Sequence, residues 1–277
     1  MNSQLVARTR RIAFFAVVGI LTLLMAIQWW VVTTPALVWF PDGFVNGFFA
    51  SRVDDFAIHR IHRLATGITT DVVLACLVIQ LRRPGTREAA AWLVSAFFAM
   101  AVVLNLVIRP TSAQLPPILW IIFALGILVG LLHPSAPLFR IPRLVDGRLL
   151  ALTAVMAVPY GFYAIQNVGL QMNGVPADPH WAGSHYQFVA ELGFQLILLG
   201  LVSSVAFTGR RLTIWLAGLA AVLMGTASAL FPNHVSSLGP AWGLALVIWG
   251  IAFVGVGMST APALASGRAP DGSPSDV

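Results

Sequence analysis

The chain has 277 residues, of which 58% are hydrophobic and only 9% are charged. A soluble domain has about 25% charged residues, so this composition excludes an ordinary soluble protein and indicates a polytopic membrane protein. All basic residues are arginine, which excludes a Schiff-base lysine, and the single cysteine, Cys76, excludes an intrachain disulfide and a thiolate metal cluster. The net charge of +6 is spread over several loops, so we expect no nucleic-acid binding.

Eight apolar segments approach the length of about 20 residues that a helix needs to cross the hydrocarbon core. We therefore predict an all-α polytopic membrane protein with eight transmembrane helices. The weakest segment is the fourth, which is short and begins after a pair of prolines. The predicted helices are 12–34, 61–81, 89–108, 117–133, 149–170, 184–207, 211–231 and 239–260.

The arginines predict the orientation of these helices. Twelve lie on the side of the N-terminus and four on the opposite side, and cytoplasmic loops are enriched in arginine. The sequence thus predicts a multi-pass protein of the bacterial plasma membrane with both termini in the cytoplasm. The four outer arginines are Arg52, Arg60, Arg63 and Arg109.

Two long outer loops and a polar tail lie between or beyond the predicted helices. The first loop, 35–58, is rich in aromatic residues, which are typical of the membrane interface. The second loop spans about 171–183. The tail, 261–277, is rich in Pro, Gly and Ser, and we expect it to be disordered in the cytoplasm.

An internal repeat divides the chain into two halves. Asp55 matches Asp178 and His62 matches His185 at one spacing of 123 residues (178 − 55 and 185 − 62). Four helices in each half then have the same orientation, so we predict two tandem four-helix bundles related by a pseudo-twofold axis along the membrane normal. The predicted halves are 1–133 and 149–260, joined by a cytoplasmic linker at 134–148.

Five of the six histidines fall on the predicted outer side, namely His59, His62, His180, His185 and His234. Ionisable side chains at membrane depth usually face a bundle interior, and imidazole is the commonest nitrogen ligand of metals and haem iron. His185 begins the sixth helix and His234 lies just before the eighth, so we predict that these two ligate the iron of one b-type haem. The alternative is that the histidines are interfacial residues that bond loop carbonyls or water.

Small residues on the sixth and eighth helices would leave room for a flat macrocycle between them. These are Gly193, Gly200, Gly243 and Gly250. The sixth histidine, His133, ends the fourth helix on the inner side, where we expect an interfacial residue.

The first half has no obvious histidine partner for its own pair. Its candidate catalytic residues and outer cations are Asp55, His59, His62, Arg60, Arg63 and Arg109. Guanidinium groups bind carboxylates and phosphates in bidentate fashion, so the arginines could hold haem propionates, a quinone headgroup or a lipid phosphate. The alternative is that they pair with Asp54 and Asp55.

Two acidic residues, Asp71 and Glu191, lie inside predicted helices, where a carboxyl group must be protonated or paired. For Asp71 we favour a structural interhelical hydrogen bond over a proton relay. The expected partners of Asp71 are Asn105, Thr69 and Thr70. Those of Glu191 are Tyr160, Tyr163, Gln166 and Asn167, which would line a cavity shared with His185.

The pattern resembles the heme A synthase family, whose members have two similar four-helix halves with histidines near the outer ends of the even-numbered helices. Ile58-His59-Arg60 and Ile61-His62-Arg63 are similar to the family's acid-x-x-His-Arg motif, and His185 and His234 are similar to its second-half histidines. The resemblance implies a bis-histidine haem b site in the second half. The chain departs from the family in the spacing of the acid from His59, the absence of a fourth-helix outer histidine, and the absence of an outer cysteine pair, which puts synthase chemistry in the first half in doubt.

The sequence therefore predicts a haem b-binding integral membrane redox protein, and an oxidoreductase if it is an enzyme. The expected partners are membrane lipid and either a quinone or a respiratory-chain protein, and a homo-oligomer is compatible with the pattern. The alternative is a non-redox membrane transporter, or an assembly or scaffold subunit, with structural histidines.

Overall fold

The computed structural model describes residues 3–28, 59–108, 117–134, 144–175, 177–182 and 184–265. Within these residues the regular structure is helical, apart from one isolated antiparallel bridge between Val145 and Val205. The long helices are α1 (Ser3–Gln28), α4 (Arg60–Arg82), α5 (Glu88–Ile108), α6 (Pro117–Leu132), α7 (Gly147–Asn173), α9 (His185–Ser204), α10 (Arg210–Leu230) and α11 (Gly239–Ala265). Two short helices, η3 (Pro84–Thr86) and α8 (Pro179–Ala182), lie between them.

By length and composition, seven of the described helices can cross a membrane. The prediction of an all-helical, multi-pass membrane protein is thus confirmed. The eighth predicted segment forms α6, which is apolar but has only 16 residues. Helix α11 continues to Ala265, past the predicted end at 260.

Several predicted features lie outside the described residues. These are Asp55, Arg109, the first outer loop at 35–58, most of the linker and the tail beyond Ala265.

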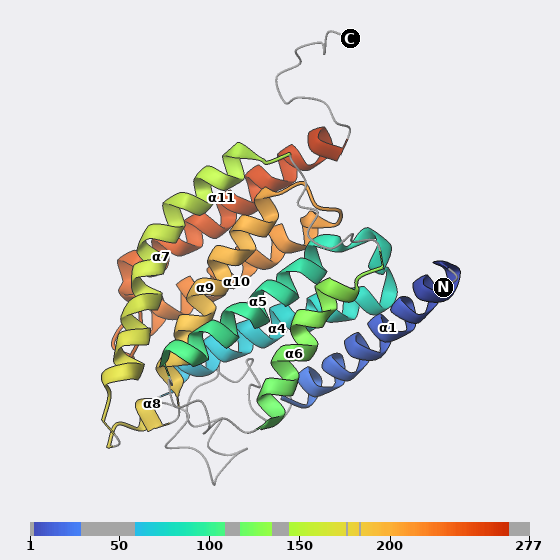
Figure 1. The fold of residues 1–277 in the computed structure, drawn as a ribbon. Coiled ribbons are helices and arrows are strands. Elements are labelled where there is room, and N and C mark those ends of the chain that lie inside the picture. Colours follow the sequence, from blue (N-terminus) through green and yellow to red (C-terminus); the bar gives the residue numbers. More distant parts are fainter. Residues whose placement is uncertain are drawn as a thin grey trace, which may run out of the picture.

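Four helices form the centre of the bundle, and four lie around them. The most apolar stretches of α4, α5, α9 and α10 are 56–61% buried, whereas those of α1, α7 and α11 are 22–28% buried. Figure 1 shows α1 and α6 on one side of these central helices and α7 and α11 on the other. Because α4 and α5 also pack against α9 and α10, residues from both halves of the chain share one hydrophobic core.

Glycines bring α10 and α11 into close contact. A Cβ added at Gly225 would lie 2.5 Å from the carbonyl oxygen of Gly243, and one added at Gly218 would lie 2.8 Å from that of Gly250. Small residues allow two membrane helices to approach along their backbones.

The four glycines that we expected to leave room for a macrocycle are instead used for helix packing. A Cβ added at Gly193 would meet the side chain of Ala164, and one added at Gly200 would meet that of Thr153. Gly243 and Gly250 face α10 in the same way. The expectation was wrong because a glycine in an apolar helix favours close contact with a neighbouring helix as readily as an open space.

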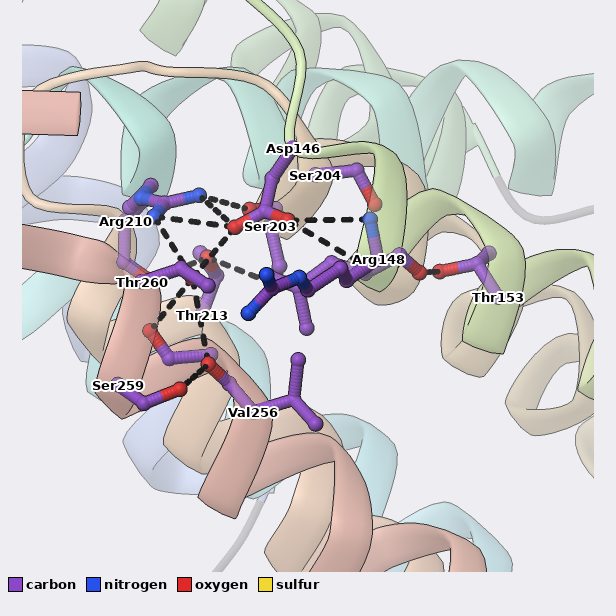
Figure 2. A network of polar contacts seen from close by, with 12 residues as sticks. Asp146, Arg148, Thr153, Ser203, Ser204, Arg210, Thr213, Val256, Ser259 and Thr260 are labelled. Atoms are coloured by element: carbon purple, nitrogen blue, oxygen red, sulfur yellow. Dashed lines mark hydrogen bonds and ion pairs between the residues drawn. The ribbon is translucent and has the colours of Figure 1, made fainter. Parts of the chain in front are cut away.

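A buried ion pair joins three helices at the predicted inner end, as Figure 2 shows. Asp146 caps α7 by accepting hydrogen bonds from the backbone N–H groups of Arg148 and Leu149. The same carboxylate binds Arg210 of α10, with Nη1 3.3 Å from Oδ2, and accepts a hydrogen bond from Thr260 of α11. Since Asp146 and Arg210 are only 6% and 5% exposed, this contact fixes α7, α10 and α11 relative to one another.

Candidate functional site

Four histidines converge where α4 and α9 begin, and we call them the histidine cluster. His59 precedes α4 and His62 lies in its first turn, while His180 belongs to α8 and His185 begins α9. The six distances between their ring centroids range from 4.1 to 6.3 Å. The sequence placed these residues on one side of the membrane, and the structure brings the pairs from the two halves into direct contact.

The hydrogen bonds of His62 define which of its ring nitrogens carries the hydrogen. The hydroxyl of Ser236 donates to Oδ1 of Asn167 at 2.8 Å and lies 3.2 Å from Nε2 of His62. Because that hydroxyl hydrogen is already used, Nε2 must be the donor to Ser236. The other nitrogen, Nδ1, is buried and has no hydrogen-bond partner among the described residues, so it is available to a ligand.

His180 is oriented by a carboxylate. Its Nδ1 lies 3.0 Å from Oδ1 of Asp178, which also accepts the backbone N–H of His180, while Tyr186 donates its hydroxyl to the other oxygen. Burial tends to raise the pKa of Asp178, but the hydrogen bonds from His180 and Tyr186 outweigh it and hold the pKa below its usual value. The carboxylate therefore takes the Nδ1 hydrogen, so that in the neutral ring Nε2 has the lone pair, as in carboxylate-oriented metal ligands.

Arg60 and His234 both contact Phe231. Arg60 is 6% exposed, and its guanidinium carbon lies 4.4 Å from the centroid of the Phe231 ring. The ring of His234 packs against the same phenylalanine, with centroids 5.5 Å apart. The structure therefore groups His185 with the other three histidines of the cluster and places His234 next to Phe231, in the turn between α10 and α11.

Glu191 lies in different surroundings from those expected. Glu191 accepts a hydrogen bond from Gln187 at 2.8 Å and lines a cavity of about 250 Å³ together with residues of α4 and α5. Polar side chains that share this cavity include Thr66, Thr69, Thr70 and Asn105. Asp71 is half-buried on α4, while two of its predicted partners, Asn105 and Thr70, donate to carbonyls of their own helices.

The polar residues of α7 line a separate cleft, between α7 and α11. Tyr160, Tyr163, Gln166 and Asn167 all border this cleft of about 1010 Å³, and neither Glu191 nor His185 is among its lining residues. The predicted cavity shared by these residues is thus replaced by two cavities, because Glu191 points toward α4 and α5.

His133 is a structural residue at the opposite end of the bundle. It is fully buried, and its Nε2 lies 2.9 Å from the carbonyl oxygen of Pro84. Arg10 donates to the His133 carbonyl at 2.9 Å, so this residue connects α1, α6 and the turn after α4.

Sequence reasoning missed three contacts that organise the site. These are the Asp178–His180 hydrogen bond, the Ser236–His62 hydrogen bond and the Asp178–Tyr186 hydrogen bond. The short spacing of Asp178, His180 and Tyr186 was a usable signal, because residues this close in sequence can meet around one helix start. Ser236 gave no such signal, since it lies 174 residues from His62.

Comparison of the chain with protein-family models, with curated proteins and with solved structures finds no match. The resemblance to the heme A synthase family therefore depends on the motifs and the helix order described above.

Proposed function

We propose that this protein is an integral membrane redox protein that binds haem b at the outer end of its helix bundle, with His180 and His185 as the iron ligands. The observation that supports the proposal most is the contact of four imidazole rings, one of them oriented by Asp178. Haem iron needs two nitrogen ligands, and the imidazoles of His180 and His185 would supply them. The centroids of His180 and His185 are 6.3 Å apart.

The charges beside the cluster favour haem over a bare cation. Arg60 directly follows His59 and is buried, and Arg63 directly follows His62 and is half-buried, both in the first turn of α4. Two guanidinium groups are suited to the two propionates of a haem, whereas they repel a divalent ion. The described residues also contain no group of three His, Cys, Asp or Glu side chains arranged to hold a metal ion, and haem iron needs only two such ligands.

Several residues near the cluster would have separate roles in holding the haem. Haem supplies one-electron chemistry when it is bound, while Asp178 orients His180 and makes it a stronger ligand. Arg60 and Arg63 would bind the two haem propionates. The rings of His59 and His62 both lie within 5.5 Å of the rings of His180 and His185, so both have to move aside when a macrocycle enters.

The predicted twofold architecture is part of the proposal. Helix α4 packs against α1 and α5 as α9 packs against α7 and α10, and α5 packs against α6 as α10 packs against α11. This matching supports two four-helix halves, each of the same orientation, with the histidine cluster between them and α6 as the eighth span. Both proposed ligands, His180 and His185, belong to the second half, and His59 and His62 of the first half contact their rings.

A second candidate is a site for a single transition-metal ion without a macrocycle. Four imidazoles placed tetrahedrally on one ion have ring centroids about 5 Å apart. The observed separations of 4.1–6.3 Å surround that value. No three of the described His, Cys, Asp or Glu side chains are arranged to hold an ion, so the imidazole rings would have to rotate before their nitrogens met at one point.

The experiment is the absorption spectrum and metal content of detergent-purified protein, expressed with ample haem precursor. We expect a Soret band in the wild-type protein, lost or shifted in His180→Ala and His185→Ala. The matched control is His133→Gln, which changes a buried histidine at the other end of the bundle and should leave the band unchanged. A colourless protein with one metal ion per chain would favour the second candidate, and a colourless, metal-free protein would favour the transporter or scaffold alternative.

A further inference from the structure

The cleft between α7 and α11 opens toward the surroundings of the bundle. Three residues that line it, Val155, Val158 and Phe162, are 70%, 76% and 73% exposed. They lie on an apolar span, so the surroundings of this opening are the lipid of the membrane. A ligand therefore enters the cleft sideways, from the bilayer.

The end of the cleft near the turn before α11 is polar, and its side chains are held by hydrogen bonds. Tyr163 donates its hydroxyl to the carbonyl oxygen of Ser236, and the Ser236 hydroxyl donates to Asn167 at 2.8 Å. Gln166 also lines this part. These contacts hold the turn before α11 against α7. Tyr160, which lies one turn before Tyr163 on α7, also lines the cleft.

Tyr160 provides an unused hydrogen-bond donor. The residue lines the cleft and is only 4% exposed, and its buried hydroxyl has no hydrogen-bond partner among the described residues. An unpaired polar group in an apolar membrane region costs free energy, so a ligand that offers an acceptor to this hydroxyl would be stabilised. One residue earlier, Pro159 has no N–H to donate to the carbonyl of Val155, which adds a second polar group at this depth.

The lining also defines the chemistry of the headgroup. None of the described residues that line the cleft is charged, so a phosphate headgroup would find no arginine to pair with. Aromatic rings are prominent instead, namely Tyr160, Phe162, Tyr163, Trp242 and Trp249. Such rings pack favourably against a flat ring.

We infer that this cleft binds a lipid-soluble quinone, whose ring lies near Tyr160 with a carbonyl oxygen accepting the tyrosine hydroxyl, and whose prenyl chain extends toward the bilayer. The volume of about 1010 Å³ is at the upper end of the range of about 300–1,000 Å³ for small-molecule pockets. Ser236 connects the polar end of the cleft to His62 of the histidine cluster. The inference concerns binding alone and holds whether or not the cluster binds haem.

The test is photolabelling of the full-length protein in phosphatidylcholine nanodiscs with an azido-benzoquinone that has a prenyl chain, followed by peptide mapping. We expect label on peptides of α7 and α11, and loss of that label when unlabelled prenyl quinone is added. Ala245→Trp fills the cleft and should abolish the label, whereas Ala154→Trp adds the same side chain on the exposed side of α7 outside the lining and should not. Tyr160→Phe keeps the ring and should weaken binding about five- to tenfold by removing one hydrogen bond.

Three results would overturn the inference. They are label placed only on other helices, competition by added phospholipid but not by quinone, and equal labelling of Ala245→Trp and Ala154→Trp. Because the readout is the position of a label, it is independent of the haem spectrum. If the Ala245→Trp protein does not fold, the affinity of Tyr160→Phe decides the question, and an unchanged affinity contradicts the assigned headgroup position.

Discussion

Replacing Asp146 by alanine tests the buried ion pair at the inner end of the bundle (Figure 2). Among the described residues, the change leaves the guanidinium of Arg210, which is 5% exposed, with the Ser203 carbonyl and the Thr260 hydroxyl as partners. Removing one partner of a buried ion pair costs about 3–5 kcal/mol, because the other charge is left uncompensated. Losing the cap of α7 costs about 1 kcal/mol more.

The free energy of unfolding should be measured by reversible denaturation in mixed detergent micelles. We expect Asp146→Asn to be less destabilising than Asp146→Ala, because asparagine still caps a helix well but has no charge. Arg148→Ala is the control, since it removes an exposed charge two residues away and should change stability by less than about 0.5 kcal/mol.

The double variant Asp146→Ala with Arg210→Met should be less destabilised than the sum of the two single variants, because it removes the uncompensated charge. The reasoning is refuted if Asp146→Ala lowers stability by less than about 1 kcal/mol. It is also refuted if the two single changes simply add, since independent effects mean that the two side chains do not interact.

Three further predictions concern other parts of the molecule. Burial lowers the pKa of His133, an effect that the Pro84 carbonyl opposes and Arg10 reinforces. The neutral His133 therefore contributes its full stability above the unfolded pKa of about 6.5, and this contribution is lost as the pH falls toward the lowered folded pKa. His133→Gln should flatten the decline in melting temperature between about pH 7.5 and 5. Gly225→Ala should destabilise the protein by about 1–3 kcal/mol in the same denaturation assay, because the added Cβ would lie 2.5 Å from the Gly243 carbonyl oxygen. The control is Gly255→Ala, whose added Cβ would have no atom within 4 Å, and it should be neutral or slightly stabilising. Asp178→Ala should weaken haem binding about 10–100-fold in a spectroscopic titration, and an unchanged affinity would show that Asp178 does not orient a ligand.

Hydropathy was enough to predict the helices, because the length of an apolar segment is set by the membrane and not by tertiary contacts. The arginine distribution predicted that His59, His62, His180 and His185 lie on the outer side, because arginines mark the cytoplasmic loops whatever the tertiary contacts. Which histidines meet depends on how the two halves pack, so the sequence favoured His185 with His234, whereas the structure places His185 with histidines from both halves.

The remaining misses have related physical causes. Arg210 lies just outside the predicted helix 211–231, and its burial beside Asp146 was not predicted, because that burial depends on how the surrounding helices pack. Glu191 was expected to face the fifth predicted helix, but hydropathy does not define the rotation of a helix that is apolar on all sides. It lines the cavity next to α4 and α5 instead.

The reduced-minus-oxidised absorption spectrum of the purified wild-type protein tests the central proposal most directly. If the outer imidazoles ligate haem iron, dithionite reduction should shift the Soret band and produce an α band, with about one haem per chain. A protein that stays colourless after expression with ample haem, and after titration with added haemin, would contradict it.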